Sequence, residues 1–191
     1  MVRAGIFLRW RINIKLWTRS LLRSLSLFSV LSAVKNKPKS VLFVCLGNIC
    51  RSPTGEGIFR SYIGQHGNDQ EITVDSAGTI GYHQGNPADA RMRQTAARRG
   101  YDLQSRSRKI TQADLESFDL VIAMDRENLQ DIQQVHPDPT ASIKLLSHFL
   151  DDQWPTDVPD PYYGGDEGFE YVVDMIAAAV PKIYEHLTEA N

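Results

Sequence analysis

Residues 40–53 read SVLFVCLGNICRSP. The apolar residues of 41–44 are β-branched, aliphatic or aromatic, which predicts a short buried strand over 40–44. The eight residues 45–52 then turn the chain, and Pro53 suits the start of a helix that we expect to continue to about His66. A strand, a glycine-containing turn and a helix in this order are typical of an α/β fold.

The same alternation continues to the C-terminus. We predict further strands over 71–75, 120–123 and 143–146. Further helices are expected over 87–99, opened by Pro87 and ended by Gly100, and over 111–114, 126–135 and 166–187. Strands that alternate with helices predict one three-layer α/β domain over 40–191, with a four-stranded, parallel, doubly wound sheet. Ligands of such sheets bind beyond the carboxyl ends of the strands, where 45–52 lies.

The charge of the 191-residue chain is unevenly distributed. Nine of the 21 Lys and Arg residues fall in 1–39, which contains no acidic residue. Residues 40–191 contain the remaining 12 together with all 23 acidic residues, which gives this part a net charge of −11. A body this acidic argues against nucleic-acid binding.

The basic segment 1–39 has three interpretations. It is a targeting peptide, a signal peptide with its apolar region over 24–34, or a disordered or spuriously translated extension. The uncharged run 24–34 is too short for a helix to span a bilayer, so we expect no stable membrane span. We expect a cytoplasmic protein, with organelle targeting by 1–39 left open.

The chain has two cysteines, Cys45 and Cys50. A disulfide-stapled secreted fold would need more of them at wider spacing, and a zinc site would need further Cys or His ligands nearby. Two close thiols beside Arg51 indicate reactive chemistry in a reducing compartment.

The segment 45–52 has the composition of an anion-binding loop. Its backbone N–H groups can converge at a helix N-terminus, where the helix dipole favours negative charge. Gly47 permits close backbone approach, and Asn48 accepts left-handed dihedral angles. Arg51 can grip two oxygens of a phosphate. The missing Gly-Lys-Ser/Thr ending excludes a Walker loop.

The same surroundings favour a thiolate at Cys45, because a helix N-terminus and a nearby cation stabilise the charged sulfur. Ser52 could donate a hydrogen bond to that sulfur. We therefore predict that Cys45 is a nucleophile at the centre of an oxyanion cradle. Cys50 is either a filler beneath the loop or a resolving thiol that pairs with oxidised Cys45.

Cleavage of a phosphate ester requires a proton for the leaving oxygen. The segment 158–165 reads VPDPYYGG and supplies the best candidate, Asp160, between two prolines. Tyr162 and Tyr163 suit a pocket wall, and the two glycines suit a hinge.

These two motifs, with DSAG at 75–78, GNP at 85–87 and AMD at 123–125, closely resemble the low-molecular-weight protein tyrosine phosphatases over about 40–188. The resemblance implies a flavodoxin-like fold. It also implies that the chain hydrolyses phosphotyrosine, with phosphotyrosyl proteins or small aryl phosphates as its substrates. It also implies a phosphocysteine on Cys45, Asp160 as general acid and base, and no metal or cofactor. The phosphate would be held by Arg51 and the amides of the loop, which comprises Leu46, Gly47, Asn48, Ile49, Cys50 and Ser52.

By the same resemblance, Asn48 and Ser76 brace the loop, Ser52 assists departure of the thiolate, and Asp125 is a supporting aspartate. The substrate pocket would be formed by Ile49, Tyr82, Tyr162 and Tyr163, although Tyr82 also suits a role in surface packing.

Three alternative functions place different demands on the same residues. Related arsenate reductases need cysteines downstream of Cys50, and this chain has none. Protein-arginine phosphatases typically carry Thr where Ile49 stands and lack the paired tyrosines. A non-catalytic phosphotyrosine-binding module needs neither Cys45 nor Asp160. The sequence does not indicate an oligomeric state.

Overall fold

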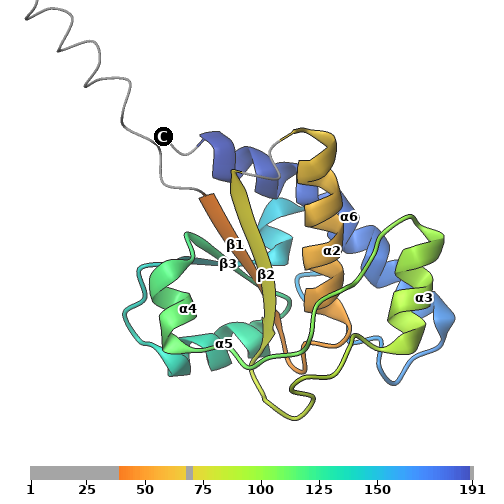
Figure 1. The fold of residues 1–191 in the computed structure, drawn as a ribbon, viewed down its shortest axis with the longest axis horizontal. Helices are drawn as coiled ribbons and strands as arrows, with labels where there is room; N and C mark the ends of the chain where they lie inside the picture. The colour runs from red at the N-terminus through yellow and green to blue at the C-terminus, as the bar shows by residue number, and fades with distance from the viewer. Residues whose placement is uncertain (1–38, 68–70, 190–191) are drawn as a thin grey trace, which may run out of the picture. The chain divides into compact units, whose positions relative to one another are not determined.

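The computed structural model describes residues 39–67 and 71–189 (Figure 1). Residues 38–191 form one compact unit. The expectations for 1–38, including the apolar run 24–34, lie outside the described residues. Within the described ranges, no helix is both long and apolar enough to cross a membrane.

The elements alternate along the chain as expected. The strands are β1 (Lys39–Cys45), β2 (Ile72–Gly78), β3 (Leu120–Ala123) and β4 (Ser142–Leu145), and a 3-10 turn, η2 (Leu146–Phe149), follows directly. The helices are α2 (Arg51–Gln65), α3 (Ala90–Arg98), α4 (Gln112–Ser117), α5 (Arg126–Val135) and α6 (Asp166–Glu189).

The four strands form one parallel sheet in the order β2-β1-β3-β4, which confirms the predicted fold class. Cys45 at the end of β1 pairs with Gly78 at the end of β2, and Val44 pairs with Ala123 at the end of β3. The carboxyl ends of the central strands therefore meet at one edge, which is where ligands bind in open α/β sheets.

Helices cover both faces of the sheet (Figure 1). Val41 and Phe43 point into a core shared with α2, α3 and α6. The intervening Leu42 and Val44 point into a second core shared with α4 and α5. Because consecutive side chains of a strand face opposite ways, residues 41–44 of β1 must all be apolar to serve both cores.

Helix α3 begins at Ala90, so the predicted start at Pro87 was wrong. Pro87 instead forms an isolated bridge with Arg106. The Asp89 carboxylate accepts a hydrogen bond from the backbone N–H of Arg91 and caps the helix there. A capping side chain fixes a helix start more strongly than a proline that merely tolerates one.

Candidate active site

The loop 45–52 joins the end of β1 to the start of α2 at the carboxyl edge of the sheet. Asn48 has a φ of 53°, as predicted, and it is the only non-glycine residue with positive φ in the described part of the chain. Between 46 and 50, no backbone N–H donates a hydrogen bond to any other described residue. Adjacent N–H groups without partners are rare and form the kind of concavity that binds anions.

The thiol of Cys45 lies at the base of this loop and is buried. Its Sγ lies 3.1 Å from Ser52 Oγ, in the first turn of α2. The Ser52 hydroxyl also lies 3.1 Å from the carbonyl oxygen of Ala77, so its proton has two acceptors. Sequence reasoning predicted the contact between Cys45 and Ser52, and the structure has it.

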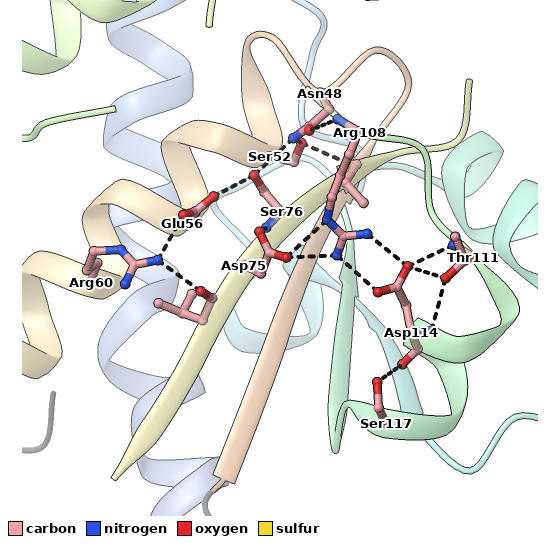
Figure 2. A network of polar contacts seen from close by, with 12 residues as sticks. Asn48, Ser52, Glu56, Arg60, Asp75, Ser76, Arg108, Thr111, Asp114 and Ser117 are labelled. Carbon is pink, nitrogen blue, oxygen red and sulfur yellow. Dashed lines mark hydrogen bonds and ion pairs between the residues drawn. The ribbon is translucent and has the colours of Figure 1, made fainter. Parts of the chain in front are cut away.

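The Asn48 side chain connects the loop to its support (Figure 2). Its Oδ1 accepts the backbone N–H of Arg108 at 2.9 Å, which fixes the amide orientation. Its Nδ2 then donates to Ser52 Oγ and to Ser76 Oγ, both at 2.9 Å. Asn48 thus holds the loop against both α2 and β2, the bracing contacts that were expected of Asn48 and Ser76.

Glu56 extends this chain of hydrogen bonds and was not predicted (Figure 2). Because the Ser76 oxygen accepts from Asn48, its own proton points to Glu56 Oε2 at 2.6 Å. Glu56 is buried, and its other oxygen pairs with Arg60 one helical turn away at 2.9 Å. The sequence did contain a signal for this role, because Glu56 lies on the apolar face of a helix. A carboxylate buried there requires hydrogen-bond or ion-pair partners.

Arg51 brings together the two predicted aspartates. Its Nη1 donates to Asp125 Oδ2 and its Nη2 to Asp160 Oδ2, the latter at 2.9 Å. Nη1 also lies 3.2 Å from the Val158 carbonyl oxygen. Burial by itself lowers the pKa of the guanidinium, but Cys45, Asp160 and Asp125 outweigh it and raise that pKa above its ordinary value. The cation is therefore permanent and aimed at the site.

Asp125 has a second contact that fixes its position. Its Oδ1 accepts the backbone N–H of Asn128 at 2.6 Å and caps helix α5. One carboxylate thus ties Arg51 to the end of β3.

A pocket of about 410 Å³ opens above the thiol. Its walls contain all four residues predicted for the substrate pocket. Tyr82 and Tyr163 are largely exposed, at 85% and 93%, so they form the rim, whereas Tyr162 is 38% exposed. The full lining is Cys45, Leu46, Gly47, Ile49, Cys50, Arg51, Ile80, Tyr82, His83, Asp160, Tyr162 and Tyr163.

Three residues at this pocket were not predicted from the sequence: Ile80 and His83, which line it, and Arg91, which contacts Tyr162. His83 packs on Tyr82, with ring centroids 4.9 Å apart, and lies against Gly47. Arg91 donates to the carbonyl oxygen of Tyr162 at 3.2 Å and stacks over its ring at 5.4 Å. None of the three belongs to a recognisable motif, so only the folded chain identifies them.

Cys50 lies in the pocket lining and is buried. Burial, with the nearby charges of Asp89, Cys45 and Asp160, raises the pKa of the Cys50 thiol far above its ordinary value. Both cysteines are free thiols. The Cys50 thiol is therefore protonated at neutral pH, and both interpretations of Cys50 remain predictions. Across residues 39–67 and 71–189, no group of three or more His, Cys, Asp or Glu side chains is arranged to hold a metal ion.

Comparison with protein-family models matches residues 40–191 to the family described as low molecular weight phosphotyrosine protein phosphatase. The chain is 42% identical over 139 residues to the Bacillus subtilis low molecular weight protein-tyrosine-phosphatase YfkJ, covering 72% of this chain and 88% of that protein. It is 42% identical over 137 residues to the human low molecular weight phosphotyrosine protein phosphatase, covering 70% and 86%.

Solved structures agree with the fold. The crystal structure of Bacillus subtilis YfkJ superposes with a TM-score of 0.76 at 37% identity, covering 81% of this chain and 98% of that one. A Drosophila arginine phosphatase superposes with a TM-score of 0.73 at 31% identity, covering 79% and 99%.

Proposed function

The chain belongs to the low molecular weight phosphotyrosine protein phosphatase family, and from this premise we propose that it hydrolyses phosphotyrosine through a phosphocysteine on Cys45. It is a hydrolase of the protein-tyrosine-phosphatase class. This proposal includes the phosphotyrosyl substrate and the chemical roles of individual residues. It also includes the separation of 1–39 from a catalytic domain over 40–191.

The phosphate group binds in the loop 45–52. Its three equatorial oxygens accept hydrogen bonds from the free N–H groups of 46–50 and from the Arg51 guanidinium. In the present structure Arg51 Nη2 donates to Asp160. The arriving phosphate takes over this donor, which leaves the Asp160 carboxyl free to approach the ester oxygen.

In the first step the Cys45 thiolate attacks phosphorus in line with the ester bond. The S–P bond forms, the bond from phosphorus to the tyrosyl oxygen breaks, and Asp160 gives its proton to that oxygen. The product is a neutral phenol, which leaves past the tyrosine rim of the pocket.

In the second step a water molecule attacks the phosphocysteine. Asp160, now a carboxylate, takes a proton from the water, the S–P bond breaks, and inorganic phosphate leaves. Ser52 stabilises the departing thiolate by hydrogen bonding, since its hydroxyl lies 3.1 Å from Sγ.

One observation carries the proposal. A buried thiol, an arginine with two donors, free loop amides and an exposed carboxyl converge on one aromatic-rimmed pocket. Each group has a place in phosphoryl transfer, whereas phosphate binding alone requires neither the thiol nor Asp160.

A protein-arginine phosphatase is the second candidate, because the Drosophila arginine phosphatase shares the fold at 31% identity. Ile49 and the tyrosines at 162 and 163 favour an aromatic leaving group, since the pocket is rimmed by rings that stack on a phenol. Phosphoarginine therefore serves as the competing substrate in the test below.

The test compares turnover of p-nitrophenyl phosphate, a phosphotyrosine peptide and phosphoarginine. We expect Cys45→Ser to abolish turnover and Asp160→Ala to lower kcat for the two aryl esters by about 10²–10⁴-fold. After an acid quench, the Asp160→Ala protein should carry one phosphoryl group on Cys45 by mass spectrometry.

Asp138→Ala is the matched control, because Asp138 is exposed and does not line the pocket. Turnover that persists in Cys45→Ser would refute the mechanism. Faster turnover of phosphoarginine than of the phosphotyrosine peptide would assign the chain to the second candidate.

A further inference from the structure

A second hollow, of about 320 Å³, adjoins the active-site pocket. The two share Leu46, Arg51 and Asp160 in their walls, so they open on either side of one ridge. The remaining walls of the second hollow come from the start of α5 and from the segment before Asp160, namely Asp125, Arg126, Glu127, Asn128, Asp157, Val158 and Pro159.

Most of the charged groups in this hollow are already engaged in ion pairs or hydrogen bonds with one another. Arg126 and Asp157 bind each other through both guanidinium Nε and Nη2, and Asp157 also accepts the backbone N–H of Arg126. This pairing lowers the pKa of Asp157 and keeps it ionised. Asp125 is occupied by Arg51 and by the cap of α5.

Glu127 is the exception. Its side chain is exposed, and it makes no hydrogen bond or ion pair with any residue that the structure describes. The walls hold four carboxyl groups and two arginines; Asp160 carries the catalytic proton when substrate binds, which leaves three carboxylates, and Arg51 is directed to the phosphate site. A side chain that enters the hollow therefore meets more negative than positive charge, and the Glu127 carboxylate is available to pair with it.

We propose that this hollow is a subsite for a lysine or arginine side chain close to the phosphotyrosine in the substrate peptide. The proposal rests on the proposed function, since the phosphotyrosine must occupy the neighbouring pocket. A peptide that crosses the ridge at Leu46 brings a flanking side chain over Glu127 and Asp157. The aliphatic part of that side chain lies along Leu46 and Pro159, which are both exposed.

An acidic side chain is disfavoured at the same place. The start of α5 could attract an anion through its dipole, but Asp125 and Asp157 already accept the N–H groups of Asn128 and Arg126 there. The net charge of −11 over 40–191 also favours the approach of basic peptides over acidic ones.

The test uses phosphotyrosine peptides that differ at one position, with Lys, Ala or Glu placed in turn at each of the two residues before and after the phosphotyrosine. For at least one position, we expect kcat/KM to follow the order Lys, Ala, Glu, with each step up to about fivefold, as for one exposed ion pair. The difference should appear in KM and weaken at high salt.

Glu127→Lys should reverse that order at the same position. Glu185→Lys is the matched control, because Glu185 is an exposed acid on α6 outside both hollows, and it should keep the wild-type order. Each variant is compared by the ratios among its own peptides, so a general change in activity does not affect the result.

Equal kcat/KM values for the Lys, Ala and Glu peptides at all four positions would overturn the subsite. The same order in Glu127→Lys as in the wild type would also overturn it. p-Nitrophenyl phosphate has no flanking residues, so its turnover by the wild type is measured in parallel. Its loss in Cys45→Ser would support the proposed function even if the subsite fails, and its absence from the wild type would refute the proposed function itself.

Discussion

Gly78 lies directly beneath the loop 45–52 at the end of β2. A Cβ added there would lie 2.7 Å from the Leu46 carbonyl oxygen and 3.1 Å from the Asn48 nitrogen. Both are backbone atoms, so the loop itself would have to move. The adjoining residues Thr79 and Ile80 donate to the carbonyl oxygens of Cys45 and Leu46, which holds the loop at this distance.

Gly78→Ala should therefore misplace the loop amides without unfolding the protein. A displacement of about 1 Å in a catalytic constellation costs on the order of 10²-fold in rate. We expect a loss of that size in kcat/KM for p-nitrophenyl phosphate, measured by steady-state kinetics.

Gly64→Ala is the control within the same protein, since a Cβ at Gly64 meets nothing within 4 Å. It should leave kcat/KM unchanged and raise the free energy of unfolding by up to about 1 kcal/mol, because alanine is the better helix former. Equal activity in the two variants would show that the loop does not need the close approach at Gly78.

At the scale of elements, Arg108 joins β2 to α4 (Figure 2). Its guanidinium pairs with Asp75 on β2 at 2.8 Å and with Asp114 on α4 at 2.9 Å. Asp114 also completes a capping box with Thr111. Because the backbone N–H of Arg108 holds Asn48, the packing of α4 is coupled to the loop through one residue.

This junction should be sensitive to acid. Burial alone raises the pKa of Asp114, but Arg108 and Thr111 outweigh it and lower that pKa below its ordinary value of 3.8. The carboxylate therefore stabilises the fold fully above about pH 4, and this contribution is lost as the pH falls through the lowered pKa.

We expect Asp114→Asn to lower the free energy of unfolding by about 1.5–3 kcal/mol at pH 7, the range for hydrogen bonds to a charged group. Urea titrations at a series of pH values should show this gap shrinking below about pH 4. Asp138→Asn, at an exposed position, provides the comparison. A gap that is constant from neutral to acid pH would exclude the ionised carboxylate as its source.

At the scale of the whole molecule, residues 38–191 form a compact unit that contains every side chain proposed for the chemistry. The hydrogen-bond partners that the structure describes for those side chains also lie within it. We expect a protein that starts at residue 38 to retain the kcat/KM of the full chain for p-nitrophenyl phosphate. A folded truncated protein, verified by circular dichroism, with much lower activity would contradict the proposed division at residue 39.

The alternation of strands and helices was predictable because buried parallel strands and capped helices have short-range signatures. The turn at 45–52 was predictable for the same reason, since Gly47, Asn48 and Arg51 lie within one turn of the chain. Helix α3 was placed too early because the competing signals, Pro87 and the Asp89 cap, lie two residues apart and only folding decides between them.

The amino-acid sequence by itself determined the α/β class and the family, and it predicted an anion loop with its thiol, arginine and acid. The tertiary structure alone brought Asp125 and Asp160, which lie 74 and 109 residues beyond Arg51, onto one guanidinium. It also placed Glu56 and Arg91 behind the site and opened the hollow beside Glu127. These contacts depend on parallel strands ending at a common edge, a long-range arrangement to which no local pattern of residues corresponds.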